Sequence, residues 1–316
     1  MKSIGGYFGL ELPEKEAFHK EAIALNTGRC ALECVLTTNN YTKIYLPYYS
    51  CEALLEPILK LNIPHEFYPI NTRLEPEFNY ERILESEVFL YINYFGIKDP
   101  FISTLHQITP NLIIDNVQSF FSLPIPQVNT FYSARKFFGV PDGAYLYSAV
   151  TTNPAFEVDS SADRMQHLLM RIDKSAEEGY SLFQKNEVRL QHLPIRLMSE
   201  LSKKLLASID YDAVAEKRKL NFQYLHERLS AHNKLSIDWD GNQVPMNYPF
   251  WSDNNNLRDL LFSHKIYCPV YWPNVLLQKG FYTLEKNLAN QLICLPVDQR
   301  YTQTDMDYII NLILHI

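Results

Sequence analysis

The alternation of short strand-like and helix-like segments in the first two-thirds of the chain is the feature that most limits its possible folds. Strand patterns fall at 43–46, 65–70, 87–95 and 111–115, and helical patterns fall at 31–38, 51–61 and 102–108. This order favours an α/β fold with a mainly parallel sheet covered by helices on both faces. Ligands in such folds bind beyond the carboxyl ends of the strands, so we expect the chemistry in the loops there.

The last third of the chain has a different pattern. Residues 160–230 are expected to be helical, most clearly at 195–209 and 211–229, and a turn-rich break follows at 238–242. Strands are expected again at 248–251 and 293–296, with helices at 255–264 and after Thr302, where Asp305 completes a capping pattern. For a chain of 316 residues this predicts a large domain over 1–212 and a small α+β domain over 213–316.

Charge and hydropathy exclude several classes of partner. The formal net charge is −7, and no run of basic residues is longer than the three of Lys217-Arg218-Lys219, so nucleic acid is not expected. The longest apolar stretches are too short to cross a bilayer, and residues 1–10 do not resemble a secretory signal. We therefore expect a protein that acts on small molecules.

The cysteines and histidines do not form a recognisable metal site. The five cysteines are odd in number and lack CxxC spacing, which is typical of reduced thiols in a cytoplasmic protein. The nine histidines show no HExxH or paired spacing. No metal is expected.

Asp115 and Lys136 are the two residues that most strongly suggest a specific chemistry. Asp115 ends an apolar strand, where an unpaired carboxylate is costly to bury, so it needs a cationic partner. The protonated pyridine nitrogen of pyridoxal phosphate is such a partner. Lys136 follows 21 residues later, which leaves room for one further strand that returns to the same end of the sheet. By itself, however, a lysine followed by Pro141, Asp142 and Gly143 is also typical of a solvated turn.

Two further segments contain groups suited to a phosphate. Gly28 stands between Asn26-Thr27 and a helical pattern that starts near Arg29, so a helix N-terminus with free N–H groups is expected there. Ser133 offers a hydroxyl three residues before Lys136. An ordinary helix cap and turn at Thr27 and Gly28 is an equally good interpretation of the first segment.

Together these segments resemble the DegT/StrS-like sugar aminotransferases, a family of fold-type-I pyridoxal-phosphate enzymes, over nearly the whole chain. Residues 26–32 resemble the phosphate-binding turn of that family, and 46–51 resemble the segment that supplies a ring-stacking side chain. Residues 115–118 resemble its "DAAQ" signature, and 133–144 resemble its lysine motif. The resemblance implies a three-layer, aspartate-aminotransferase-like large domain and a homodimer.

The resemblance also implies roles for individual residues. Lys136 would carry the cofactor covalently, Asp115 would meet the ring nitrogen, and Gln118 would lie near the phenolic oxygen. The phosphate and ring contacts fall on the remaining predicted cofactor-binding residues, which are Thr27, Gly28, Arg29, Tyr49, Cys51 and Ser133.

The chain departs from the family pattern at three positions. Cys51 stands where the stacking aromatic residue is usual, so stacking passes to Tyr49 or is absent. Phe131 replaces a serine five residues before the lysine, which moves the expected phosphate contact to Ser133. Pro194 replaces an asparagine that reaches across the dimer in the family.

The resemblance implies an aminotransferase that moves an amino group from an amino acid such as glutamate to a keto-sugar, in particular one linked to a nucleotide. A lysine rather than a histidine at position 136 favours transamination over dehydration. Asn93, Tyr271 and Arg300 are weaker candidates for substrate contacts, and for each a structural role is an alternative. Two other hypotheses stay open: another pyridoxal-phosphate reaction on an amino acid, and an inactive homologue that serves as a binding or scaffold protein.

Overall fold

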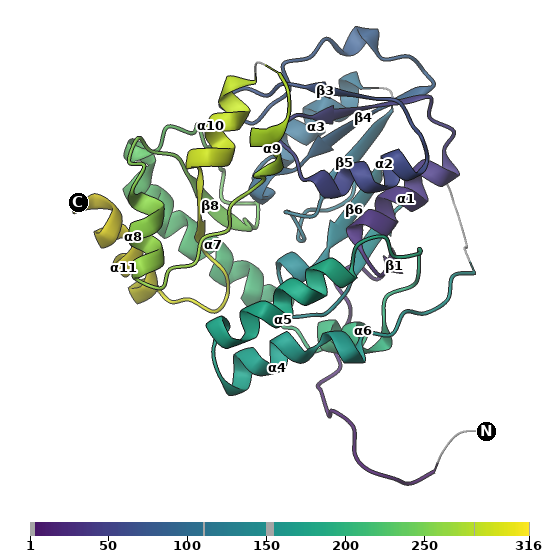
Figure 1. The fold of residues 1–316 in the computed structure, drawn as a ribbon, viewed down its shortest axis with the longest axis vertical. Helices are drawn as coiled ribbons and strands as arrows, with labels where there is room; N and C mark the ends of the chain where they lie inside the picture. The colour runs from purple at the N-terminus through teal and green to yellow at the C-terminus, as the bar shows by residue number, and fades with distance from the viewer. Residues whose placement is uncertain (1–3, 110, 150–154, 281, 316) are drawn as a thin grey trace.

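The computed structural model describes residues 4–109, 111–149, 155–280 and 282–315. Within these ranges a seven-stranded mixed sheet forms the centre of the molecule (Figure 1), with the strand order β1-β7-β6-β5-β4-β2-β3. Its strands are β1 (Ile23–Leu25), β2 (Lys43–Pro47), β3 (His65–Tyr68), β4 (Glu87–Ile92), β5 (Leu112–Asn116), β6 (Asn129–Ser133) and β7 (Ala144–Tyr147). The pairs from β3 to β6 are parallel, and β7 runs antiparallel to both β1 and β6. The mainly parallel sheet that the sequence predicts is confirmed.

Helices surround this sheet and continue into the C-terminal part. They are α1 (Gly28–Thr38), α2 (Leu55–Lys60), α3 (Asp99–Ile108), α4 (Gln166–Asp173), α5 (Ala176–Arg189), α6 (Glu200–Ala207), α7 (Tyr211–Leu229), α8 (Leu257–Ser263), α9 (Asn274–Leu277), α10 (Thr283–Gln291) and α11 (Gln303–Leu314). The central strand β4 is buried at every position, which explains why its sequence is continuously apolar and aromatic after Glu87. No helix in the described ranges has the length and apolar character to cross a membrane.

A second, two-stranded sheet lies in the C-terminal part. It pairs β8 (Asn247–Phe250) with β9 (Ile293–Pro296) in antiparallel fashion, and α7 packs against both β8 and α11. The side chains of this region join the same hydrophobic core as those of the large sheet. The division into domains at residues 212 and 213 therefore stays a prediction.

Two predicted elements differ from the observed ones. The strand expected at 87–95 ends at Ile92, because Phe95 and Gly96 adopt left-handed backbone conformations with φ of +56° and +71°. The helix expected at 195–209 begins only at Glu200, where Ser199 accepts a cap hydrogen bond from the Ser202 N–H. The preceding segment is extended, and Leu197 forms β-bridges with two other segments. The apolar residues at 195–198 thus face the core from extended backbone, which periodicity alone does not reveal.

We expect Gly96→Ala to destabilise the fold strongly. A Cβ at this position would lie 2.9 Å from the Gln118 carbonyl oxygen and 3.1 Å from that of Val244, on backbone that already has positive φ. Left-handed strain and overpacking together predict a loss of about 2–4 kcal/mol in the free energy of unfolding. Urea denaturation measures it. Gly241→Ala is the matched control, because Gly241 also has positive φ but has no atom within 4 Å of its added Cβ. Equal losses for both variants would contradict the packing argument.

Candidate functional site

Two neighbouring parallel strands bring Asp115 and Lys136 to the same end of the sheet. Asp115 lies near the end of β5, where it is paired in register with Phe131 of β6. Lys136 lies in the 3-10 turn Ala134–Lys136 that directly follows β6. The two side chains are close enough that each shifts the pKa of the other. The structure therefore brings together the two residues on which the predicted chemistry depends.

The Asp115 carboxylate is buried, and no residue in the described part of the chain is a direct cationic partner for it. The side chain is 3% exposed, and its hydrogen bond from the Val117 N–H, 2.9 Å long, is the only one it has among the described residues. Burial raises the pKa of Asp115 to about 7, although the Val117 hydrogen bond and the charge of Lys136 act in the opposite direction. A cation placed against this carboxylate would therefore stabilise its ionised form.

Lys136 lines a cavity that is open to solvent. Its side chain is exposed, and the cavity, of about 510 Å³, lies between the lysine turn, the α4–α5 pair and residues 298–300. The surrounding protein lowers the pKa of the Lys136 amine, while Cys51 and Asp115 raise it in part. The Nζ atom lies 5.0 Å from the centre of the Tyr271 ring. A lysine with a lowered pKa is more readily available as a neutral nucleophile.

The N-terminus of α1 lies beside these two residues. A Cβ at Gly28 would contact the Val117 Cγ1 atom at 3.4 Å, so the helix start packs directly against the turn after Asp115. The Thr27 hydroxyl caps α1 by accepting from the Cys30 N–H at 3.1 Å. The Gly28 and Arg29 N–H groups precede the first intrahelical hydrogen bonds, and neither has a partner within the described part of the chain. These two N–H groups can hold an anion.

The side chains of Arg29 and Ser133 differ in their availability. Arg29 Nε pairs with Glu56 Oε2 at 3.0 Å, so the Arg29 guanidinium is already partly neutralised. Ser133 is half-buried at the end of β6, and its hydroxyl makes no cap hydrogen bond to the turn that follows. Of these two side chains, Ser133 is the better placed to contact a phosphate.

Gln118 carries a buried donor that is not used within the described residues. Its Oε1 atom accepts a hydrogen bond from the Phe95 N–H at 2.9 Å. Its Nε2 atom is buried and has no partner in the described ranges. Because an unpaired buried donor costs about 1–3 kcal/mol, an acceptor at this position would be favourable. The phenolic oxygen of pyridoxal phosphate is an acceptor of this kind, so the residues present fit the cofactor.

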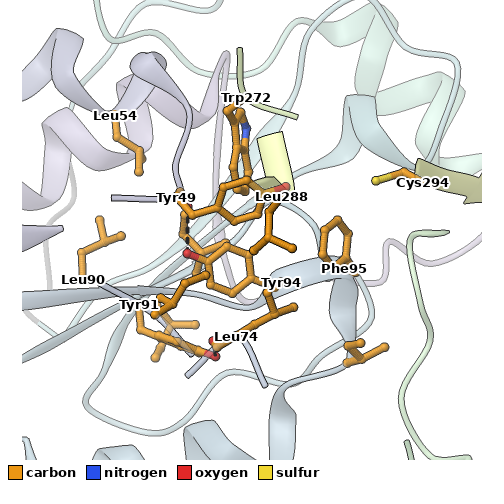
Figure 2. Close-up of a cluster of buried hydrophobic side chains, with 14 of the residues drawn as sticks. Tyr49, Leu54, Leu74, Leu90, Tyr91, Tyr94, Phe95, Trp272, Leu288 and Cys294 are labelled. Atoms are coloured by element: carbon orange, nitrogen blue, oxygen red, sulfur yellow. Dashed lines mark hydrogen bonds between the residues drawn. The ribbon is translucent and has the colours of Figure 1, made fainter. Parts of the chain in front are cut away.

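Tyr49 and Cys51 differ in their burial and in their neighbours. Tyr49 is completely buried, its ring packs edge-on against Trp272 at 4.7 Å, and its hydroxyl donates to the Tyr271 carbonyl oxygen at 3.3 Å. Figure 2 shows its ring enclosed by Trp272 and Tyr94. Cys51 is only partly buried and is close enough to Lys136 to affect its pKa. Cys51 therefore lies near the lysine, whereas Tyr49 belongs to the core.

The two polar candidates for substrate contacts already have partners. The Asn93 amide donates to Asp99 at 2.6 Å and to Asn116 at 3.0 Å, and its oxygen accepts from the Lys98 N–H at 3.0 Å. Arg300 donates through Nε and Nη2 to the Asp298 carboxylate at 2.7 and 2.8 Å. Arg300 lines the lysine cavity, but Asn93 does not line it. Substrate contacts by Arg300 and Asn93 both stay predictions, and the hydrogen bonds of Asn93 also give it a structural role.

Sequence reasoning missed the residues that hold the lysine turn. Arg135 forms an ion pair with Glu187 of α5, and its Nε is buried with no partner among the described residues. Arg218 of α7 is 2% exposed, donates to the Met246 carbonyl oxygen at 2.9 Å and lies 4.5 Å from the centre of the Phe137 ring. Arg135 could have been noticed as the neighbour of Lys136, but nothing local to residue 218 marks it as buried.

Comparisons with known proteins identify the fold. No protein-family model matches the sequence, and no curated protein sequence is significantly similar to it. Among solved structures, the chain is similar to DesV from S. venezuelae in complex with a ketimine intermediate (TM-score 0.66, 15% identity, 93% of this chain and 84% of that one). It is also similar to the sugar aminotransferase CalS13 from Micromonospora echinospora (0.65, 12%, 93% and 87%) and to NtdA from Bacillus subtilis with bound PMP (0.63, 12%, 93% and 72%). The chain therefore has the aspartate-aminotransferase-like fold type I.

We expect the cofactor-free protein to become less stable as pH rises, because of Asp115. A folded pKa of about 7 lies above the unfolded value, so the folded state keeps a proton that the unfolded state loses as pH rises. The resulting loss begins near pH 4 and levels off above about pH 7, and it amounts to about 2–3 kcal/mol between pH 5 and pH 8. Urea unfolding of wild type and Asp115→Asn measures it, since the variant lacks this dependence. Asp253→Asn, at an exposed ion pair, is the control. Parallel pH profiles for wild type and Asp115→Asn would contradict the assignment.

Proposed function

We propose that this chain is a pyridoxal-phosphate-dependent aminotransferase that transfers an amino group from an amino acid such as glutamate to a keto-sugar, in particular one linked to a nucleotide. The observation that carries the proposal is that Lys136, which lines an open cavity, lies close to the buried Asp115 carboxylate, for which the described residues provide no direct cationic partner. The similar solved structures support it, because CalS13 is a sugar aminotransferase and NtdA contains the cofactor PMP.

Each polar group of the cofactor would be contacted by a different residue of the site. Asp115 would pair with the ring nitrogen, and the Gln118 Nε2 group would donate to the phenolic oxygen. The N–H groups of Gly28 and Arg29 and the Ser133 hydroxyl would hold the phosphate, and Thr27 would fix the helix start that presents those N–H groups. Cys51 would lie beside the lysine. The bound cofactor supplies an electron sink that stabilises a carbanion at the reacting carbon.

Lys136 would carry out the proton transfers. Once the amino donor has replaced Nζ on the cofactor, the freed amine, whose pKa the surrounding protein lowers, could accept a proton from the donor's α-carbon. The same Nζ could then return the proton to the cofactor carbon to which it had been joined. Throughout these steps the ionised Asp115 carboxylate would remain paired with the protonated ring nitrogen of the cofactor.

The alternative of an inactive homologue is less well supported. It rests on the departures from the family pattern at Cys51, Phe131 and Pro194. A scaffold protein would have no need of a buried donor without an acceptor at Gln118 or a buried carboxylate without a cation at Asp115, and both carry an energetic cost. These costs favour a protein that binds the cofactor.

We expect purified protein supplied with pyridoxal phosphate to develop visible absorbance from its covalent link to Lys136. Lys136→Ala removes this absorbance or leaves only loosely held cofactor, whereas Lys203→Ala, at an exposed surface ion pair, retains it. Titration with glutamate, glutamine or alanine then converts the spectrum to that of the aminated cofactor for at least one donor. Wild type that never develops the absorbance would overturn the proposed function. A cofactor-loaded protein that responds to none of the three donors would point to another reaction.

We further propose a cytoplasmic homodimer. The five free cysteines fit a reducing compartment, and large apolar side chains remain uncovered on the single chain. Ile172 of α4 is 79% exposed and Val188 of α5 is 64% exposed, while Tyr7 and Phe8 lie on the N-terminal arm that extends away from the body (Figure 1) and are 98% and 90% exposed. Apolar surface of this kind is commonly covered by another subunit.

Sedimentation equilibrium of the cofactor-loaded protein is expected to give twice the chain mass of 36.9 kDa. Replacing both Ile172 and Val188 by Ser should weaken the dimer by about a thousandfold or more, because each change removes roughly 1–2 kcal/mol of apolar burial per subunit and a dimer carries both changes twice. Leu59→Ser, at another exposed apolar position, is the control. A monomer with full cofactor occupancy would contradict the dimer.

A further inference from the structure

We propose that Tyr271 provides the aromatic surface that faces the cofactor ring, in place of an aromatic side chain at position 51. This inference rests on the proposed function and assigns the ring contact to the C-terminal part of the chain. Cys51 has no ring with which to stack, although it lies close to both Lys136 and Tyr271. The aromatic partner must therefore come from another segment.

Tyr49, the aromatic residue nearest in sequence, is not available for this role. It is completely buried, and its ring is held between Trp272 and Tyr94, with ring centres 4.7 and 5.9 Å away. Figure 2 shows this enclosure. Its hydroxyl donates to the backbone carbonyl oxygen of Tyr271. Tyr49 thus supports the segment that carries Tyr271 and does not itself reach the cavity.

Tyr271 has the position that a ring contact requires. Its side chain is only partly buried. It packs against the hydrophobic core of the two sheets and also against a second cluster that contains Phe120 and Phe137, so it lies at the junction between them. The centre of its ring is 5.0 Å from Lys136 Nζ, the atom to which the cofactor is proposed to bind. Aromatic rings attract one another at centre separations of about 4.5–7 Å, so a ring joined to that nitrogen comes within reach of Tyr271.

The surrounding contacts hold Tyr271 in place before any ligand binds. The Asn247 side chain lies close to Tyr271, and the Tyr49 hydroxyl donates a hydrogen bond to the Tyr271 backbone carbonyl oxygen. The Phe95 and Trp272 rings flank it, with centres 6.3 and 5.7 Å away. A side chain that is fixed at its backbone and packed on its flanks loses little conformational entropy on binding, so its contribution to affinity is retained.

The test measures cofactor binding and not only turnover. For wild type, Tyr271→Phe, Tyr271→Leu and Tyr267→Leu, the dissociation constant for pyridoxal phosphate and the wavelength and circular dichroism of the visible absorbance are determined. Tyr267 is the matched control, because it lies in the same segment but is exposed and bonds to Glu177. We expect Tyr271→Leu to weaken binding about two- to tenfold and to change the circular dichroism of the visible absorbance, as expected for the loss of one aromatic pair. Tyr271→Phe and Tyr267→Leu should match wild type.

Two outcomes would overturn the inference: Tyr271→Leu with wild-type affinity and spectrum, or Tyr271→Phe with a loss as large as that of Tyr271→Leu. If the leucine variant does not fold, Tyr271→His takes its place; a partial loss of affinity supports the role, and wild-type affinity contradicts it. A wild-type protein that never develops the visible absorbance is a separate result, because it overturns the proposed function itself.

Discussion

The site depends on the burial of a carboxylate at the end of a strand that is otherwise apolar. Asp115 is almost inaccessible, and its only hydrogen bond among the described residues comes from the Val117 N–H. Among the described residues no cation pairs directly with this carboxylate, which lies where α1 begins and the lysine turn follows β6. In a parallel sheet the carboxyl ends of neighbouring strands meet at one edge, so this topology brings together a buried carboxylate, a helix N-terminus that can bind an anion, and an amine. A cation bound against Asp115 would offset the cost of burying it.

The lysine turn is held by contacts from parts of the chain that are distant in sequence. Asp142, buried just after the turn, accepts hydrogen bonds from the backbone and hydroxyl of Ser199 at 3.1 and 2.7 Å, and this ties the turn to the start of α6. Arg218 of α7 reaches the turn from the other side through Phe137. Because Arg218 also binds the Met246 carbonyl oxygen beside β8, the same guanidinium connects the lysine turn to the C-terminal sheet. A displacement of the C-terminal part would therefore also move the turn that carries Lys136.

The parts of the site that the sequence predicts are those set by local chemistry. Asp115 at the end of an apolar strand, Thr27 before a helical pattern and the spacing to Lys136 are all local signals, and the structure brings these three residues together. The residues that sequence could not place depend on tertiary packing. The apolar pattern at 195–198 is equally compatible with a helix and with extended backbone, and only its bridges to other segments decide between them. Likewise, no local pattern shows that Tyr49 is enclosed by Trp272, which is more than two hundred residues away.

Asn93 and Gln118 have similar positions in the sequence but different hydrogen-bond partners in the structure. The partners therefore distinguish a ligand-binding candidate from a structural residue better than sequence position does. Both are buried amides that follow neighbouring strands, so from the sequence alone they are equally good candidates for ligand contacts. In the structure, the donors and the acceptor of Asn93 are engaged by Asp99, Asn116 and Lys98. Gln118 uses its oxygen to fix the Phe95 backbone and leaves its amino group buried without a partner among the described residues. Since a buried donor without an acceptor is destabilising, its retention next to Asp115 is best explained by a ligand that supplies the acceptor. The same reasoning applies to the Asp115 carboxylate, which lacks a cation, so the two residues together point to one molecule that carries both an acceptor oxygen and a positively charged ring nitrogen.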